Sequence, residues 1–163
     1  MLNVKFKKLV PEAVIPTYAH PGDAGMDVRA VSINKTDDYI EYCTGLAFQL
    51  PEGYAMLIFP RSSNSKKDLV LANAVGILDA SYRGELKLRF KRQYRAYDDF
   101  SFSTQDIVNA KSTNLCLEAT KIYEVGEAVG QIMIIPYPTI QFTEVDELNT
   151  TERGTGGFGS SGK

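Results

Sequence analysis

The sequence predicts an all-β domain, a sandwich or a barrel, with a jelly roll among the candidate topologies. Three observations lead to this prediction. Short apolar segments rich in branched side chains recur along the chain, and proline and glycine separate them. One segment, residues 85–90, alternates between charged and apolar side chains, as a strand with one buried face does. No long window repeats apolar residues with the period of an α-helix.

The expected strands of the N-terminal half follow from alternation and from turn residues. Residues 2–7 alternate between apolar and polar side chains, which predicts a first strand. Segments 46–50 and 54–59 are short and apolar, and the Pro-Glu-Gly sequence at 51–53 is a turn signature. We therefore expect two consecutive strands joined by this turn.

Apolar runs predict the remaining elements. Residues 64–69 are the best helical candidate, with room for a turn or two. Residues 69–78 and 129–135 are apolar and rich in branched side chains, so each is expected to form a buried strand. Many short strands with turns between them are typical of a sandwich or a barrel.

Length and composition limit the class of protein. A chain of 163 residues has room for one domain with its own core, and we assign residues 1–152 to it. With 18 basic and 20 acidic residues the net charge is −2, which argues against nucleic acid as a partner. No apolar segment approaches the roughly 20 residues that a membrane helix needs, so we expect a cytoplasmic protein without a membrane partner.

Residues 91–120 differ from the rest of this domain because they are mostly polar and weakly patterned. We expect them to form an insertion in the β domain. The sequence leaves two interpretations open, a long solvated hairpin or loop and a surface that binds a protein partner.

The C-terminal segment, residues 153–163, is rich in glycine. Five glycines fall among positions 154 to 162, and ordering them costs much conformational entropy, so the segment alone is expected to be flexible. Arg153 adds a positive charge and Phe158 an aromatic ring, while Ser160 and Ser161 add hydroxyl groups. Because glycine backbone can wrap an anion closely, this combination predicts a lid over a ligand that carries phosphates and a ring.

Four further segments place charged and polar residues next to glycine or proline: 23–30, 60–64, 73–85 and 126–131. Each motif is weak by itself, because an Arg-Ser-Ser sequence or an aspartate after an apolar run also occurs in ordinary turns. With the C-terminal segment, however, these motifs stand in the order and rough spacing of the trimeric dUTPase family. The chain resembles that family over nearly its whole length, from residue 23 to residue 162.

The resemblance implies a distorted jelly-roll subunit assembled as a homotrimer, in which each active site draws on more than one subunit. It implies hydrolysis of dUTP to dUMP and pyrophosphate, with Mg²⁺ as the cofactor, bound to the triphosphate. Such a reaction limits the incorporation of uracil into DNA and supplies dUMP for dTMP synthesis.

The resemblance also implies which residues catalyse the reaction. Asp79 matches the aspartate that holds and deprotonates the attacking water, and its place after an apolar strand would fix its direction. Ser62 matches the residue that hydrogen-bonds near the bridging oxygen as pyrophosphate leaves. Gln131 matches a contact to the α-phosphate or to the water. Asp27 resembles the aspartate that meets Mg²⁺ through a water, with a purely structural strand residue as the alternative.

The other implied residues bind the substrate. Arg61 and Ser63 match contacts to the β-phosphate. Arg153, Ser160 and Ser161 match a clamp on the γ-phosphate, and Phe158 would stack on uracil. These implied substrate-binding residues are Arg61, Ser63, Asn73, Gly76, Leu78, Tyr82, Arg153, Phe158, Gly159, Ser160 and Ser161.

The third motif is implied to select uracil and deoxyribose. Uracil presents an acceptor, a donor and an acceptor, with which the backbone of residues 73–79 can pair as a strand would. Cytosine reverses this pattern and would leave buried polar groups unpaired. Gly76 would keep the turn tight and exclude the methyl group of thymine, and Tyr82 would pack on the deoxyribose and exclude a 2′-hydroxyl.

Two departures from the family pattern leave alternatives open. The segment between residues 85 and 126 is longer than in compact members, as in some phage-borne members that bind other proteins, so a phage-type member in the host cytoplasm is one interpretation. Position 64 is Asn where many members have an apolar residue. A dCTP deaminase, a bifunctional deaminase and dUTPase, and a regulatory protein acting through residues 91–120 are the alternative functions.

Overall fold

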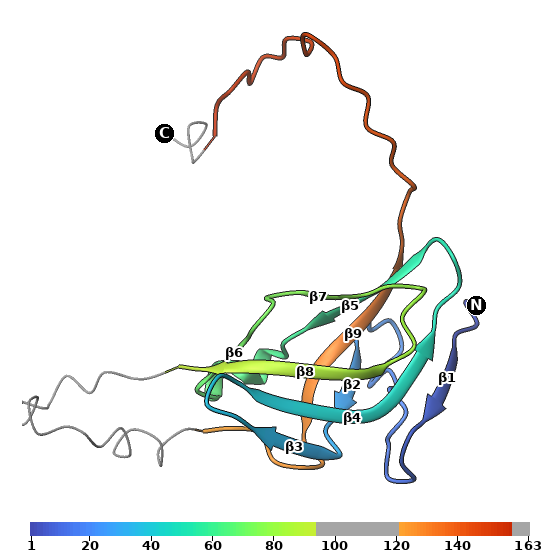
Figure 1. Ribbon diagram of the computed structural model, residues 1–163, viewed down its shortest axis with the longest axis vertical. Coiled ribbons are helices and arrows are strands. Elements are labelled where there is room, and N and C mark those ends of the chain that lie inside the picture. Colours follow the sequence, from blue (N-terminus) through green and yellow to red (C-terminus); the bar gives the residue numbers. More distant parts are fainter. Residues whose placement is uncertain (94–120, 158–163) are drawn as a thin grey trace, which may run out of the picture.

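A computed structural model of the chain describes residues 1–93 and 121–157 (Figure 1). These residues form nine β-strands and one short 3-10 helix, with no α-helix among them. The elements are β1 (Lys5–Lys8), β2 (Met26–Arg29), β3 (Ser32–Lys35), β4 (Ile40–Gln49), β5 (Tyr54–Phe59), η1 (Ser62–Lys66), β6 (Leu69–Leu71), β7 (Gly76–Leu78), β8 (Glu85–Arg92) and β9 (Ala128–Pro136).

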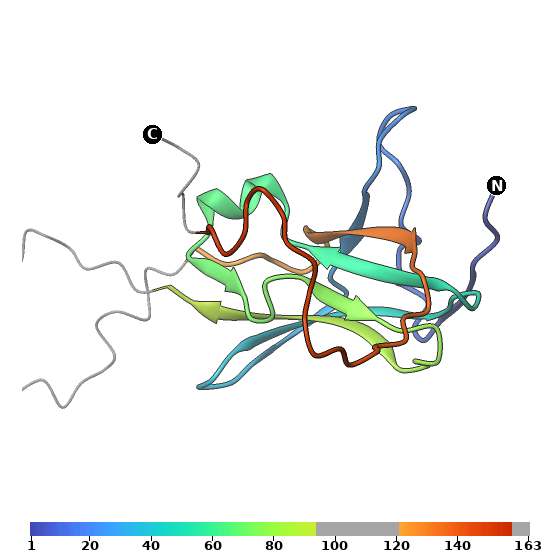
Figure 2. The same ribbon diagram turned by 90° about the horizontal axis from the view of Figure 1, so that it is seen from above.

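The strands form two antiparallel sheets. The first sheet has the order β1-β4-β8-β6, with β3 also paired to β4, and the second has the order β2-β9-β5-β7. Side chains of both sheets meet in one buried cluster, to which Tyr42 and Leu88 contribute from the first sheet and Met56 and Ile132 from the second. The two views in Figures 1 and 2 show the sheets as two layers around this core. The predicted all-β, jelly-roll-type sandwich is confirmed.

Strand β8 shows how the sequence pattern produces this packing. Its residues alternate between exposed charged side chains and buried apolar ones, and Leu86, Leu88 and Phe90 are at most 2% exposed. Because successive side chains of a strand point to opposite faces, the alternation aims all three at the core. Three aromatic rings fill one end of the core: the rings of Tyr42 and Phe90 meet edge to face at 5.5 Å, and Tyr123 packs on both.

Strand β5 lies inside the second sheet and connects the regions that carry the motifs. It pairs with β9 on one side and with β7 on the other. Gln131 lies opposite Phe59, Ile58 opposite Gly76, and Met56 opposite Leu78. Strand β2 extends the sheet on the far side of β9, where Asp27 lies opposite Gln131.

Two expected strands differ in the structure. Residues 69–78 form no single strand, because a turn divides them into β6 in the first sheet and β7 in the second. At this turn Ala74 has a φ of 57°, a left-handed conformation that is uncommon outside glycine, and its N–H donates to the carbonyl of Leu71. The first strand is β1, which begins at Lys5 rather than at residue 2, and its residues are all exposed. A helical turn is present as η1, but it spans Ser62–Lys66 rather than residues 64–69, and Leu69 belongs to β6.

The backbone of Asp68 joins the two ends of the described chain that border residues 94–120. The N–H of Gln93 donates to the Asp68 carbonyl at 2.9 Å, and the N–H of Asp68 donates to the Lys121 carbonyl at 2.9 Å. The Asp68 carboxylate also accepts the N–H of Lys121 at 2.9 Å. The predicted insertion therefore leaves and re-enters the sandwich on either side of one buried residue.

Beyond β9 the chain runs away from both sheets, as the orange-to-red segment of Figure 1 shows. Apolar side chains along it face solvent, with Phe142 93% and Leu148 85% exposed. Residues 158–163 of the predicted lid lie outside the described residues, and with them the implied substrate-binding residues Phe158, Gly159, Ser160 and Ser161. Across residues 1–93 and 121–157, no helix has the length and apolar character to cross a membrane.

Candidate active site

The end of β5 gathers the residues of three motifs into what we call the Arg61 cluster, defined as Asp27, Arg61, Ser62, Ser63 and Gln131. The chain leaves β5 through Pro60 in an extended conformation and enters η1 at Ser62. The Nε–H of Arg61 donates to Asp27 Oδ1 at 2.8 Å, and its Nη1 donates to Ser63 Oγ at 3.4 Å. Gln131 Nε2 reaches the Pro60 carbonyl at 3.5 Å.

Two glycines allow this close packing. A β-carbon on Gly25 would lie 2.9 Å from Gln131 Oε1, so the absent side chain leaves the space that the amide occupies. A β-carbon on Gly130 would collide with Leu88 and lie 3.0 Å from the Phe59 carbonyl. Both glycines belong to motifs, and the structure gives them a steric role beside the Arg61 cluster.

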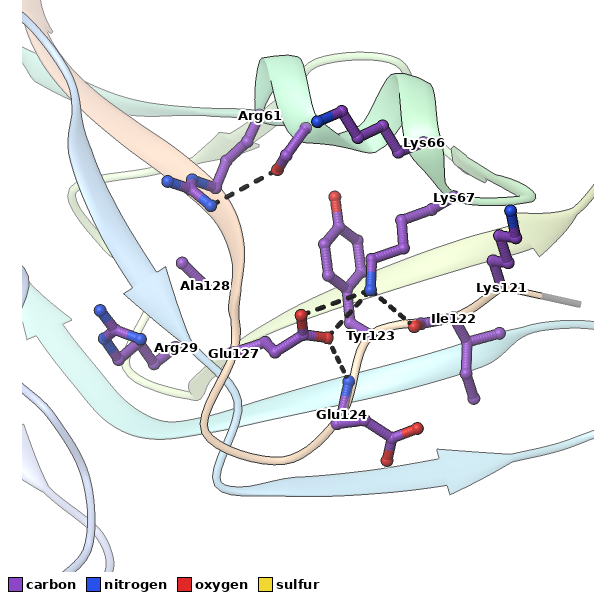
Figure 3. A pocket seen from close by; sticks show the side chains of 11 residues that line it. Arg29, Arg61, Lys66, Lys67, Lys121, Ile122, Tyr123, Glu124, Glu127 and Ala128 are labelled. Atoms are coloured by element: carbon purple, nitrogen blue, oxygen red, sulfur yellow. Dashed lines mark hydrogen bonds and ion pairs between the residues drawn. The ribbon is translucent and has the colours of Figure 1, made fainter.

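The segment after residue 120 supports η1 from below (Figure 3). The ammonium group of Lys67 donates to the Glu127 carboxylate at 3.0 Å and to the Ile122 carbonyl at 2.8 Å, and it lies 4.6 Å from the centre of the Tyr123 ring. The N–H of Glu124 also donates to Glu127. This hydrogen bond, with those from Lys67, outweighs partial burial and lowers the pKa of Glu127.

A cavity of about 790 Å³ opens between η1 and this segment. Five basic side chains line it against two acidic ones, Glu124 and Glu127, and Figure 3 shows the basic side chains around the Lys67–Glu127 pair. The basic lining residues are Arg29, Arg61, Lys66, Lys67 and Lys121. Their combined charge favours an anion at this end of the second sheet.

The residues of the third motif form a separate group, the Asp79 cluster, defined as Asn73, Gly76, Leu78, Asp79 and Tyr82. All five line one cavity of about 210 Å³. Leu78 is buried, whereas Asp79 directly after it is exposed. Tyr82 is 47% exposed, its N–H donates to the Asp79 carbonyl, and its ring lies against Gly84. Core packing therefore does not account for the Tyr82 side chain.

Backbone groups are available beside the Asp79 cluster. Strand β7 pairs with β5 on one side and has no strand on its other side among the described residues. An edge strand presents N–H and C=O groups in alternation to whatever lies next to it. A planar ring with alternating donors and acceptors can pair there as another strand would.

The Asp79 end of the Asp79 cluster lies far from Arg61 along β5. Gly76 lies opposite Ile58, three residues before Arg61, but Leu78 lies opposite Met56, five residues before it. At roughly 3.4 Å per residue this places Leu78, the neighbour of Asp79, about 17 Å from Arg61 along the strand. Within one subunit, Asp79 therefore does not face the guanidinium of Arg61.

Some motif residues have local structural contacts. The Asp23 carboxylate accepts the N–H of His20 at 2.8 Å, and Arg29 donates to the Gly126 carbonyl at 2.9 Å, as expected for residues that stabilise turns. Arg153 donates from Nε to the Gly156 carbonyl at 2.9 Å within the C-terminal segment. Figure 1 shows the segment after β9 running away from the sheets, and among the described residues the only hydrogen bond of the Arg153 side chain stays within this segment.

Sequence reasoning missed the residues that support η1. Tyr123 and Lys67 lie outside every motif, and Glu127, although it falls within the motif 126–131, was assigned no role. Tyr123 lies 59 positions from Asn64 on η1 and Lys67 lies 55 positions from Ile122, so their proximity depends on the tertiary fold. A lysine and a glutamate sixty positions apart carry no local signal in a sequence.

The oxygen ligands that the described residues offer suit a metal ion that is held mainly by the phosphates of a bound nucleotide. Within residues 1–93 and 121–157, no group of three or more His, Cys, Asp and Glu side chains is placed to hold a metal ion. Asp27 is one half-exposed carboxylate whose Oδ1 is held by Arg61, so its second oxygen can accept a hydrogen bond from a metal-bound water. Mg²⁺ keeps several waters and binds through phosphates with few carboxylates, so these residues fit it.

A β sandwich with a cavity lined by basic side chains and an open edge strand beside a second cavity has the features expected of an all-β protein that binds a nucleotide. The profile of the dUTPase family matches residues 11–106. The deoxyuridine 5′-triphosphate nucleotidohydrolase of Fusobacterium nucleatum is 38% identical over 169 positions that span 100% of both chains. That of Thermobifida fusca is 34% identical over 99% of this chain and 79% of its own.

Solved structures agree with these relatives. A dUTPase of Staphylococcus bacteriophage 80alpha, solved with dUpNHpp, has a TM-score of 0.71 and 28% identity over 99% of both chains. The chain belongs to the dUTPase family. The predicted enzyme class, a dUTP diphosphatase, is confirmed by the family profile and the relatives.

Proposed function

We propose that this chain hydrolyses dUTP to dUMP and pyrophosphate by attack of water on the α-phosphorus, in active sites shared between the subunits of a homotrimer. The distance between Asp79 and Arg61 supports the shared site. Leu78, directly before Asp79, lies opposite Met56, five residues before Arg61, which is about 17 Å along the strand at roughly 3.4 Å per residue. A complete site then needs the Asp79 cluster of one subunit beside the Arg61 cluster of another.

Asp79 is the proposed general base. Pairing of β7 with β5 fixes the direction of the backbone immediately before it, and its carboxylate is exposed in the single subunit. A carboxylate held in this way can orient a water and take its proton as the oxygen attacks the phosphorus. The P–O bond to the β-phosphate breaks, and the electron pair leaves with pyrophosphate.

The Arg61 cluster is proposed to stabilise charge on the phosphates. A guanidinium has five N–H donors, and the contacts with Asp27 and Ser63 use two of them. The remaining donors, with Ser62 near the bridging oxygen and Gln131 near the α-phosphate, meet the oxygens that gain charge in the transition state. Donors that are already in place cost little reorganisation.

Asp27 is the residue proposed to face the metal. Arg61 holds one carboxylate oxygen, which leaves the other to accept a hydrogen bond from a metal-bound water. Mg²⁺, when bound to the triphosphate, would neutralise negative charge on the phosphate oxygens. Asp27 would then orient the triphosphate relative to Arg61, and Arg153 with the tail serines would clamp the γ-phosphate from another subunit.

Edge strand β7 is proposed to recognise the base. Its backbone alternation fits uracil, and a cytosine ring would leave buried donors and acceptors unpaired. The half-exposed ring of Tyr82 offers a surface for deoxyribose beside the same cavity. The product dUMP would serve dTMP synthesis, and the reaction would keep uracil out of DNA, both in the cytoplasm.

A second, protein-binding role is proposed for residues 91–120. The phage 80alpha dUTPase, which matches 99% of this chain, is described as controlling the transfer of virulence genes. The bordering residues Gln93 and Lys121 both bond to Asp68, close after η1, so a partner there would lie near the Arg61 cluster. Replacing residues 94–120 by a short turn should leave dUTP hydrolysis largely intact and abolish partner capture.

Substrate tests distinguish the proposed reaction from its alternatives. The purified protein with Mg²⁺ is given dUTP, dCTP, dTTP or UTP in separate reactions, and pyrophosphate and ammonia are followed together. Pyrophosphate from dUTP alone is expected. Ammonia from dCTP would point instead to a deaminase, and absence of product from all four would favour the protein-binding role.

Subunit mixing tests the shared site. Arg61→Ala and Asp79→Asn are each expected to lower kcat by several orders of magnitude while the fold is retained. When the two variants are co-expressed, a mixed trimer can join an intact Asp79 cluster to an intact Arg61 cluster. Activity should then recover to a sizeable fraction of wild type, and no recovery in verified mixed trimers would contradict the shared site.

A further inference from the structure

The side chain of Asn64 connects η1 to the core through two hydrogen bonds. Its Nδ2 donates to the Leu69 carbonyl at 2.8 Å, and its Oδ1 accepts the hydroxyl of Tyr123 at 3.1 Å. Figure 3 shows this hydroxyl pointing toward η1 from the segment below it.

Tyr123 is itself held on several sides. It is 1% exposed, its N–H donates to the hydroxyl of Tyr42 at 3.1 Å, and its carbonyl accepts that hydroxyl at 3.3 Å. Its ring packs against the rings of Tyr42 and Phe90, and the Lys67 ammonium group lies over it. Burial raises the pKa of Tyr123, so its hydroxyl stays protonated and available as a donor at neutral pH.

Helix η1 needs an external support of this kind. It has five residues, none of them buried, and no side chain caps its N-terminus. So short a helix has little stability of its own in water. Contacts with the rest of the fold must therefore fix Ser62 and Ser63 in place.

We propose that Asn64 and Tyr123 act as a pair of positioning residues for the phosphate-binding donors of Ser62 and Ser63. This inference rests on the proposed role of the Arg61 cluster in binding the β-phosphate. The pair touches no substrate atom. It acts by fixing where η1 presents its serines, and so it affects a ligand with a β-phosphate but not one without.

The hydrogen bond between Asn64 and Tyr123 can be tested by replacing one or both residues with apolar ones. In Asn64→Leu the buried Tyr123 hydroxyl loses its main acceptor, and in Tyr123→Phe the Asn64 carbonyl loses its donor. Leaving a buried polar group unpaired is costly, whereas replacing both partners by apolar groups of similar shape is nearly neutral. The double variant Asn64→Leu/Tyr123→Phe should therefore recover the part of each loss that comes from the unpaired Tyr123 hydroxyl or Asn64 carbonyl, while the Leu69 carbonyl still lacks its amide donor.

Calorimetry with two ligands measures the effect. Each single variant is expected to weaken binding of dUpNHpp on the order of tenfold, the size typical of an unpaired buried group. Binding of dUMP, which lacks the β-phosphate, should be unchanged, and kcat for dUTP should fall more than KM rises. Thermal unfolding of every variant records its stability separately.

The outcomes separate this inference from the function on which it rests. Arg61→Ala is the control: if it leaves dUpNHpp binding unchanged, the proposed phosphate site is wrong. If Arg61→Ala weakens binding but both single variants match wild type, the positioning role is wrong. Equal losses for dUpNHpp and dUMP, or a double variant at least as impaired as the worse single one, would also overturn it. Should Asn64→Leu not fold, Tyr123→Phe and the double variant decide the matter.

Discussion

Gly25→Ala is a perturbation whose effect on catalysis can be worked out from distances. The added β-carbon would lie 2.9 Å from Gln131 Oε1, 3.5 Å from its Cδ and 3.7 Å from its Cβ. Gly25 is not in the left-handed region, so the backbone accepts alanine without strain. The nearest contact is the movable end of a side chain, so the amide of Gln131 should give way while the sheet stays as it is.

The expected size of the effect follows from the displacement. Ordinary contact begins near 3.4 Å, so the amide oxygen must move by about half an ångström. A misplacement of about 1 Å can cost on the order of 100-fold in rate, so we expect kcat to fall about tenfold, or about 1.4 kcal/mol. Stability should change little, because the overlap is relieved within one flexible side chain.

A double-mutant cycle provides the assay. Pyrophosphate release from dUTP gives kcat for wild type, Gly25→Ala, Gln131→Ala and the double variant. If Gly25 acts through Gln131, adding Gly25→Ala to Gln131→Ala should cost nothing further. A wild-type kcat in Gly25→Ala, or the same tenfold loss in the Gln131→Ala background, would refute the reasoning.

Three further predictions concern stability and the tail. Glu41 is 5% exposed, and burial raises its pKa, but hydrogen bonds from Arg89 and Lys87 outweigh burial and hold the pKa below its ordinary value of 4.5. The stability that this carboxylate adds to the fold is therefore complete above pH 4.5 and is lost as the pH falls through the lower pKa of the folded state. The melting temperature should drop with acidification in that range, and less so in Glu41→Gln. In Ala74→Gly the strain of a left-handed alanine, about 1–2 kcal/mol, is removed, while glycine adds an entropy cost of about 0.5–1 kcal/mol. The net gain should raise the melting temperature by roughly 2 °C in calorimetry. Deleting residues 153–163 should leave an intact sandwich by circular dichroism, since β9 ends at Pro136, but should lower kcat strongly if the tail is the lid.

Sequence pattern predicted elements well where one face of a strand is exposed. The alternation at residues 85–90 identified β8, and the turn at 51–53 separated β5 from the strand before it. Residues 69–78 were wrongly expected as one strand, because every position that could mark the turn is apolar or small except Asn73. The break there depends on a left-handed alanine, a conformation that composition does not signal.

In the candidate site, too, some features could be predicted from the sequence and others could not. Motif residues could be named from the sequence, but the distance between Asp79 and Arg61 along β5 depends on the direction and register of β7, which no local pattern carries. The support of η1 by Tyr123 was equally out of reach, because its hydrogen-bond partners lie 59 positions or more away in the chain. Tertiary contacts set both features.

The bonds at Asp68 also bear on how this protein can change over evolutionary time. Gln93 and Lys121 flank the same residue, so the ends of any segment grafted between them start as neighbours. Each doubling of a flexible loop's length costs only about 0.6 kcal/mol, which the sandwich can tolerate without adjustment elsewhere. Lineages can therefore lengthen, shorten or exchange that segment while the enzyme persists, and a protein engineer can use the same junction to install a sensor or a binding module next to a working catalyst.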